Sequence, residues 1–442
     1  MQKRNSVTKN AAWIISCKIV QSLLGLVVSA LSARYLGPSN YGVINYAASI
    51  IAFMLPIVQL GFRSTLVREI VEKPECEGEI IGTSLFFNFL SAIACTIAVY
   101  GFVKVANPGE QTTLIVCVLY SISLFAQALE MIQYWFQAKM ISQYTSLTGL
   151  AAYVIMTAYK IYLLATQKSV YWFAVSNALD YFIIAIVLIV IYHKLGGQKL
   201  KVSFKRFKEM FVRSRFFIVS SLMVTIFAQT DKIMLKTMIN DEAVGIYSAA
   251  VTCAGLTSFV FASIIDSFRP VVFENKQKSS KLYEDSLILC YSIVIFLSLA
   301  QSVVFTLFSR LIIGILYGSE YVASANVLSL VVWYTTFSYI GPVRNVWMLA
   351  EEKQKYLWII NLSGALTNIL LNTMLIPIMG VMGAALASLI TQIFTNVIIG
   401  FIMKPIRYNN KLMLKGCNPA LIVNYTKQFI LNIMNRKGKK NV

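Results

Sequence analysis

The chain alternates long apolar stretches with short polar segments throughout its 442 residues. Twelve of these stretches reach or exceed the roughly 20 residues that an α-helix needs to cross the hydrocarbon core of a membrane. The pattern therefore predicts an all-α integral membrane protein with about twelve transmembrane helices. The predicted spans are 11–32, 41–62, 80–103, 112–138, 146–165, 169–192, 214–238, 242–268, 285–308, 321–349, 355–377 and 380–403.

The longest polar connection before the C-terminal tail, at 193–213, divides the predicted spans into two sets of six. Within it, Phe204, Phe207 and Phe211 recur at helical spacing among basic residues. This pattern favours a helix on the cytoplasmic membrane surface, and a plain basic loop is the alternative. We predict an N-terminal six-helix lobe at 1–192, a cytoplasmic linker at 193–213, a C-terminal six-helix lobe at 214–403 and a basic cytoplasmic tail at 404–442.

The two halves resemble one another weakly. The sequence YGVINYA at 41–47 opens the second span, and VGIYSAA at 244–250 occupies the corresponding place in the eighth. An even number of spans in each half gives both halves the same orientation, a plan that many transporters share, with the binding site between the repeats. Chance similarity is the alternative for so few matches.

The distribution of basic residues predicts the orientation in the membrane. The chain has 39 Lys and Arg against 19 Asp and Glu, and 57% of its residues are hydrophobic. The basic residues concentrate in alternate connections, whereas the intervening loops carry only Arg34, Lys104, Lys168 and Arg310. Because basic loops stay in the cytoplasm, both termini are expected there. The excess charge meets anionic membrane lipids, so we expect no nucleic-acid partner.

Several predicted spans carry polar residues every three to four positions, which places them on one helix face. Helix–helix contact through Ser, Thr and Asn is one explanation for these stripes, and a water-filled polar cavity is the other. The basic residues within the stripes favour the cavity, because a charge facing hydrocarbon is costly. The stripes include Lys18, Ser22, Gly25, Ser29 and Ser32; Asn45, Ser49, Pro56, Gln59 and Arg63; Gln127, Glu130, Gln133, Tyr134 and Gln137; Ser221, Thr225, Gln229, Lys232 and Lys236; and Asn361, Asn368 and Asn372.

The charges inside the predicted spans are mainly positive. Basic residues outnumber the acids Glu130, Asp180 and Asp231, and a net positive cavity suits an anionic or phosphorylated passenger. For the basic residues near span ends, extension of the side chain to the membrane surface is the alternative. The basic residues in the spans are Lys18, Lys160, Lys232, Lys236 and Arg344, with Arg63 and Arg269 at cytoplasmic span ends.

The sequence offers no catalytic constellation. It lacks a nucleotide-binding Walker A motif, and a single histidine, His193, makes a His-ligated catalytic metal improbable. We therefore expect no enzyme activity, no cofactor and no metal.

The segment ARYLGPSNYG at 33–42 resembles the (S/A)R-x-LGP-x-x-(Y/F)G signature of Wzx-type O-antigen flippases, which belong to the multidrug/oligosaccharidyl-lipid/polysaccharide superfamily. Weaker matches are Thr230-Asp231-Lys232, Gly245-Ile246-Tyr247 and GVMGAA at 380–385. The resemblance implies a MATE-like V-shaped transporter with two six-helix lobes. It also implies export of undecaprenyl-pyrophosphate-linked oligosaccharide from the cytoplasmic to the periplasmic leaflet of the bacterial inner membrane, by alternating access coupled to an ion gradient.

This resemblance assigns roles to the charged residues. Lys18, Lys160, Lys232 and Arg344 are candidates for binding the anionic headgroup, with Arg63 and Arg269 beside them. Asp180 and Glu130 are candidate ion carriers, and an ion pair of Asp180 with Lys160 is the alternative for Asp180. A polysaccharide polymerase and a chain-length regulator are the expected protein partners.

Three other functions remain open at this point. A drug/cation antiporter would share the fold, but Lys18 replaces the acidic residue usual in its first span. A peptidoglycan-precursor flippase is also similar, although many have fourteen spans. A scaffold subunit of a polysaccharide polymerase complex would belong to another class of protein. The sugar, the coupling ion, the oligomeric state and the type of surface polysaccharide stay open.

Overall fold

The computed structural model describes residues 2–419, except for the side chains of 2–20, 22, 23 and 64. Nearly all of these residues are helical and none lies in a strand, which confirms the predicted all-α class. The longer helices are α1 (Gln2–Val58), α3 (Glu77–Ala106), α4 (Gln111–Leu129), α6 (Gln143–Ala165), α7 (Val170–Lys194), α8 (Phe204–Met238), α9 (Asp241–Ala254), α10 (Ser258–Lys278), α11 (Ser280–Leu307), α13 (Val322–Ala350), α14 (Leu357–Met379) and α15 (Val381–Ile393). The shorter ones are α2 (Leu66–Glu72), α5 (Gln133–Ala138), α12 (Ser309–Tyr317), α16 (Ile399–Ile402) and α17 (Arg407–Gly416).

Within the described range, 10 helical segments are long and apolar enough to cross a membrane, so the chain is a multi-pass membrane protein. The sequence predicted about twelve, and the difference has two sources. The first two predicted spans both lie in α1, which consists of two helices joined across a kink at Gly37, and Leu24–Val58 is counted as one candidate span. Helix α13 coincides with another predicted span and has 29 residues, but it is not one of the 10 candidates. The orientation of the termini stays a prediction, and residues 420–442, with the apolar stripe predicted there, lie outside the described range.

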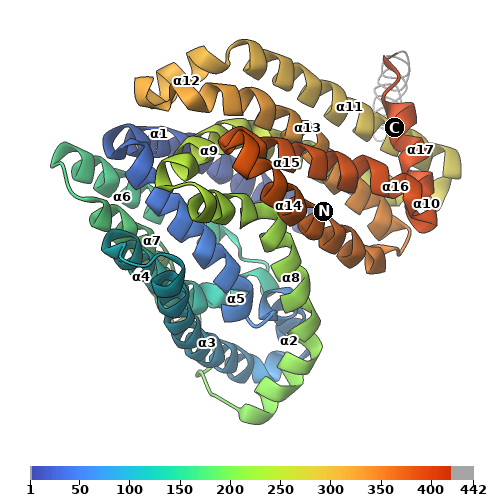
Figure 1. Ribbon diagram of the computed structural model, residues 1–442. Helices are drawn as coiled ribbons and strands as arrows, with labels where there is room; N and C mark the ends of the chain where they lie inside the picture. The colour runs from blue at the N-terminus through green and yellow to red at the C-terminus, as the bar shows by residue number, and fades with distance from the viewer. Residues whose placement is uncertain (1, 420–442) are drawn as a thin grey trace. The chain divides into compact units, whose positions relative to one another are not determined.

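The chain forms two compact units. The first contains the residues up to Ala249 together with Ile315–Tyr321, and the second contains Ala250–Gly314 and the chain from Val322 onward. In the first unit, α1 packs against α3, α4, α6 and α8. In the second unit, α13 lies between α11 and α15 (Figure 1). The lobe boundaries predicted from the sequence stay a prediction.

Helix α1 is broken at Gly37, which has φ 71° and ψ 169°. A positive φ is unfavourable for residues with a Cβ, and the following Pro38 has no amide hydrogen for the helical ladder. The segment Ile315–Tyr321 belongs to the same unit and contacts this break. Tyr321 donates a hydrogen bond from its hydroxyl to the carbonyl of Ala33 at 2.9 Å, and Arg34 donates to the carbonyl of Ile315.

Two glycines allow α1 and α9 to approach at backbone distance. A Cβ placed on Gly42 would lie 1.8 Å from the carbonyl oxygen of Asp241, and one on Gly245 would lie 2.0 Å from that of Pro38. Any side chain at either position would overlap with the facing backbone, so only glycine fits without a shift. The two glycines occupy matching positions in the weak sequence repeat, and the repeat itself stays a prediction.

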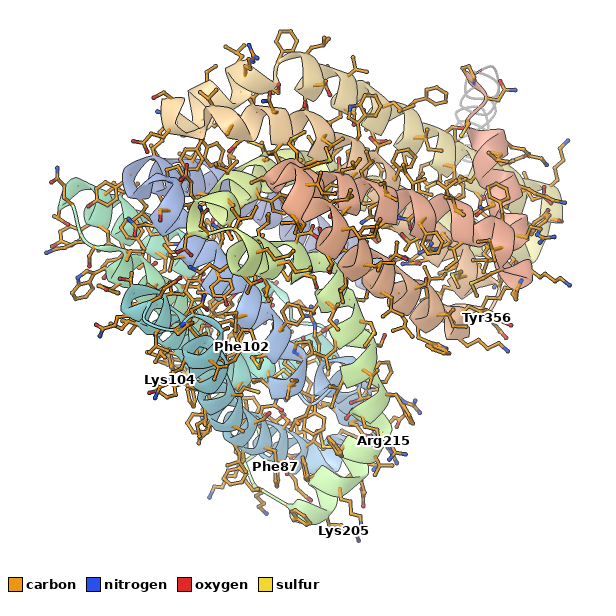
Figure 2. All side chains as sticks on the ribbon, in the orientation of Figure 1. Phe87, Phe102, Lys104, Lys205, Arg215 and Tyr356 are labelled. Carbon is orange, nitrogen blue, oxygen red and sulfur yellow. The ribbon has the colours of Figure 1, made fainter. Side chains whose placement is uncertain are left out.

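Helix α8 begins at Phe204, so the aromatic segment is continuous with the following predicted span in one helix; its position at the membrane surface stays a prediction. Phe207 stacks on Phe87 of α3, with ring centroids 3.8 Å apart. This packing explains the helical spacing of the phenylalanines. Lys205 and Arg215 of the same helix are exposed and point outward (Figure 2).

The preceding segment, 195–203, contains no regular helix and is hydrogen-bonded to the beginning of α3. The amide of Lys201 donates to the carbonyl of Gly78 at 3.2 Å, and the amide of Ser203 donates to the hydroxyl of Thr83 at 3.1 Å. These bonds satisfy backbone groups that an irregular segment leaves without partners of its own.

Lys236 connects three elements near the C-terminal end of α8. Its ammonium lies 2.5 Å from a carboxylate oxygen of Glu110 and 2.6 Å from one of Asp241, and only 3% of its side chain is exposed. Burial tends to raise the pKa of the Glu110 carboxyl, but hydrogen bonds from Lys236 and Thr113 more than offset this and lower the pKa. Lys236 therefore balances two carboxylates and is a structural residue.

We predict that Glu110→Gln lowers the Tm of the purified protein by roughly 1–3 °C at pH 7, as for a partly exposed ion pair. The folded pKa of Glu110 is depressed below its ordinary value of 4.5, so the ion pair stabilises the fold above that pH. The Tm difference between wild type and variant should shrink as the pH falls through the lowered pKa. Thermal unfolding between pH 7 and pH 3 measures this.

Glu242→Gln is the matched control, because Glu242 is exposed and lies beside Asp241 in the first turn of α9. It should leave the Tm unchanged. A Glu110→Gln difference that stays constant over this pH range would contradict the ion-pair account.

Candidate functional site

A cavity of about 380 Å³ lies in the first unit between the C-terminal part of α1, the turn η1 (Phe62–Ser64) and α8. Polar side chains from the predicted stripes of α1 and α8 face it, and they follow helical spacing. The polar part of the lining, with the proline that accompanies it, comprises Pro56, Gln59, Arg63, Ser220, Ser221, Thr225 and Gln229. Of these residues, all but Ser220 belong to the stripes predicted from the sequence.

Close packing of α8 against α1 positions this cavity. The hydroxyl of Ser49 donates to Oε1 of Gln229 at 3.0 Å, which connects the two helices. A Cβ on Gly61 would lie 2.4 Å from the carbonyl oxygen of Ser214, so a glycine at this turn permits the approach. Arg63 is exposed and is the one charged side chain in the lining of this cavity.

A second cavity of the first unit has a volume of about 190 Å³ and is enclosed by α1, α4, α6 and α7. Lys160 of α6 is the one charged residue in its lining. Asn45 of α1 and Asn177 of α7 contribute amides, and Tyr120 and Tyr153 contribute hydroxyls. Both cavities thus combine one basic side chain with neutral hydrogen-bonding groups, a set that can bind an anionic group and hydroxyls together.

The two candidate ion carriers lie close to these cavities. Glu130 begins the short 3-10 turn η3 (Glu130–Ile132) after α4, and the charges of Asp180 and Arg63 act on it. Asp180 lies on α7, half-buried, and its Oδ1 has no hydrogen-bond partner among the described residues. Lys160 and Asp180 act on each other electrostatically, but no ion pair within 4.0 Å joins them in the described part of the chain.

The structure does not bring all the predicted basic residues together. Lys232 is half-buried on α8 beside Asp231 and lines neither cavity. Arg269 belongs to the second unit, is exposed, and lies 3.0 Å from Asp266 one turn earlier on α10. Arg344 is also in the second unit, with 5% of its surface exposed. The side chain of Lys18 lies outside the described residues, and the headgroup roles of these four residues stay predictions.

Tyr120, Tyr153 and Asn177 are lining residues that the sequence reasoning missed. Tyrosines inside apolar helices are usually packing residues or lie at the membrane surface, so their position carried no signal for a cavity. Asn177 lies three residues before Asp180 on α7 and therefore on a similar face. The spacing of Asn177 and Asp180 was the sequence signal that could have indicated Asn177 as a lining residue.

The chain belongs to the polysaccharide biosynthesis protein family, which matches residues 7–276. Its fold is shared by the lipid II flippase MurJ in an inward closed conformation, with a TM-score of 0.76, 16% identity and coverage of 95% of this chain and 99% of that one. It also matches an inward-facing MATE multidrug transporter of the MOP superfamily, with a TM-score of 0.67, 11% identity and coverage of 90% and 96%.

A MOP superfamily transporter from Pyrococcus furiosus, described as having a binding pocket of reversed polarity, matches with a TM-score of 0.55, 13% identity and coverage of 92% and 96%. No curated protein matches the chain in sequence. At these identities the structural likeness establishes a MATE-like fold, as the sequence predicted.

We predict that Asp180→Asn and Lys160→Met each lower the Tm by roughly 3–6 °C, and that the double variant recovers part of this loss. The reason is that each single change leaves one partly buried charge without its compensating neighbour. Lys104→Met is the matched control, because Lys104 is exposed at the end of α3 and should tolerate the change. Additive losses without recovery in the double variant would show that the two charges are independent.

Proposed function

We propose that this protein translocates undecaprenyl-pyrophosphate-linked oligosaccharide repeat units from the cytoplasmic to the periplasmic leaflet of the bacterial inner membrane. The observation that carries the proposal is membership of the polysaccharide biosynthesis protein family. The MATE-like fold, shared with a lipid II flippase and with multidrug transporters, supports a transporter rather than an enzyme. A polymerase and a chain-length regulator are the proposed partners.

The charge of the two cavities supports an anionic passenger. Arg63 and Lys160 are the charged side chains of their respective linings, and both are basic. An ammonium or guanidinium forms strong hydrogen bonds with phosphate oxygens, and Arg does so through two parallel N–H groups. A cationic drug would gain nothing from these residues, which disfavours the antiporter alternative.

Neutral polar groups beside each basic residue support a sugar-bearing passenger. Gln59, Thr225 and Gln229 in the first cavity offer amide and hydroxyl groups. Such groups both donate and accept hydrogen bonds, as sugar hydroxyls do. A scaffold subunit would have no use for two polar cavities in its membrane region, because hidden polar surface without a ligand is costly there.

The proposed mechanism is alternating access coupled to an ion gradient. The headgroup enters from the cytoplasmic side, and its diphosphate binds to basic side chains while the lipid tail stays in the bilayer. A conformational change then opens the site to the periplasm. Glu130 and Asp180 are the proposed ion carriers, because both are partly buried carboxylates near the cavities.

Purified protein in liposomes tests this proposal with a fluorescent undecaprenyl-pyrophosphate oligosaccharide, whose arrival in the opposite leaflet is measured by quenching. Wild type should accelerate the transfer, and Arg63→Gln should slow it roughly tenfold or more, since a hydrogen bond to a charged group contributes about 1.5–3 kcal/mol. Lys104→Gln, a change of an exposed lysine outside both cavities, should have no effect.

A second arm replaces the substrate by lipid II, because the fold is shared with a lipid II flippase over 95% of this chain. Transfer of lipid II alone would favour the peptidoglycan-precursor alternative. Absence of transfer of either lipid by wild type would contradict the proposed function.

A further inference from the structure

Arg344 is a buried cation in the second unit. It lies on α13, which packs between α11 and α15, and 5% of its surface is exposed. No acidic side chain lies within 4.0 Å of it in the described part of the chain. An uncompensated charge in a protein interior costs several kcal/mol, so the guanidinium needs an acceptor or an anion.

The described contacts satisfy only part of this need. Nη1 of Arg344 donates to the carbonyl of Thr395 at 2.7 Å. Thr395 belongs to a π-helical turn, η7 (Phe394–Ile398), in which the usual helical ladder is interrupted. Nε of Arg344 is buried and has no acceptor among the described residues. A Cβ placed on Gly341 would lie 3.7 Å from Nη2 and 2.8 Å from Oδ1 of Asn396, so the glycine leaves room for the guanidinium and this amide side by side.

A second buried donor lies one turn further along the same helix. Trp347 has 1% of its surface exposed, and its indole Nε1 has no hydrogen-bond partner in the described range. Residues three apart lie on the same side of a helix, so Arg344 and Trp347 are neighbours. The ammonium of Lys353 lies 4.7 Å from the centroid of the Trp347 ring, and the carboxylate of Glu351 acts on it electrostatically.

Two buried donors without acceptors, one of them on a guanidinium that has no acid close by in the described chain, favour one kind of ligand. A neutral acceptor would satisfy the N–H groups but leave the charge uncompensated, whereas an anion does both. The buried core of this unit includes Tyr291, Val343 and Ile399. So enclosed a position suits a monovalent anion of the size of a halide rather than a lipid-linked diphosphate.

The geometry points to a binding site for a small monovalent anion beside Arg344 and Trp347, which stabilises the second unit. The site goes beyond the proposed function, because it concerns an ion bound within one unit and does not depend on the passenger. It also differs from the headgroup role predicted for Arg344 from the sequence.

Thermal unfolding of the purified full-length protein tests the site, with chloride replacing gluconate at constant ionic strength. Chloride should raise the Tm of wild type by about 2–4 °C in a saturable manner. Arg344→Gln should abolish this rise, and Arg344→Lys should retain part of it. Trp347→Phe should increase the half-maximal chloride concentration roughly tenfold, because it removes a donor to a charged ligand.

Arg269→Gln is the matched control, since Arg269 is an exposed arginine of the same unit paired with Asp266. Its chloride response should equal that of wild type. If Arg344→Gln does not fold, Trp347→Phe decides: an unchanged half-maximal concentration contradicts the site. A chloride response retained by Arg344→Gln, or none in wild type, also overturns it. A rise with inorganic pyrophosphate but not with chloride would assign Arg344 to the headgroup instead.

Discussion

The cost of placing charge inside a helical membrane protein determines much of this structure. The charged residues meet that cost in different ways. Lys236 is balanced by Glu110 and Asp241, while Lys160 and Arg63 each line a polar cavity. Arg344 has one carbonyl acceptor and no acid close by in the described chain. The first solution is structural, and for the other two we propose that an anion binds.

Helix α1 connects this electrostatic pattern to the fold. Its break at Gly37 redirects the chain. The part before the break lines the cavity shared with α4, α6 and α7, and the part after the break lines both that cavity and the one beside α8. Gly42 and Gly245 permit the close packing of α1 and α9 that holds the first unit together. Small changes of backbone angle at a glycine–proline break can therefore alter both cavities, which is the kind of coupling that alternating access requires.

The sequence predicted the helical class, the position of most spans and the polar stripes that line the cavities, because hydrophobicity and helical spacing are local properties. It failed where tertiary packing decided the outcome. Nothing in the sequence indicated that Phe207 stacks on Phe87, a residue far away in sequence. Tyr120 and Tyr153 were not recognised as lining residues. From the sequence, Lys160 and Arg344 were equivalent candidates, because both are basic residues inside predicted spans. Only the fold shows that Lys160 lines a cavity and that Arg344 lies in a packed core.

The central claim is that the cavity between α1 and α8 binds the headgroup of a lipid-linked oligosaccharide. Protection of a single cysteine at Ser221 from a water-soluble thiol reagent tests it most directly, in protein from which the seven natural cysteines have been removed. Undecaprenyl-pyrophosphate oligosaccharide should slow labelling of this cysteine but not of one at the outward-pointing Lys104 (Figure 2), and undecaprenyl phosphate should protect far less. Equal labelling at Ser221 with and without the oligosaccharide lipid would contradict the account.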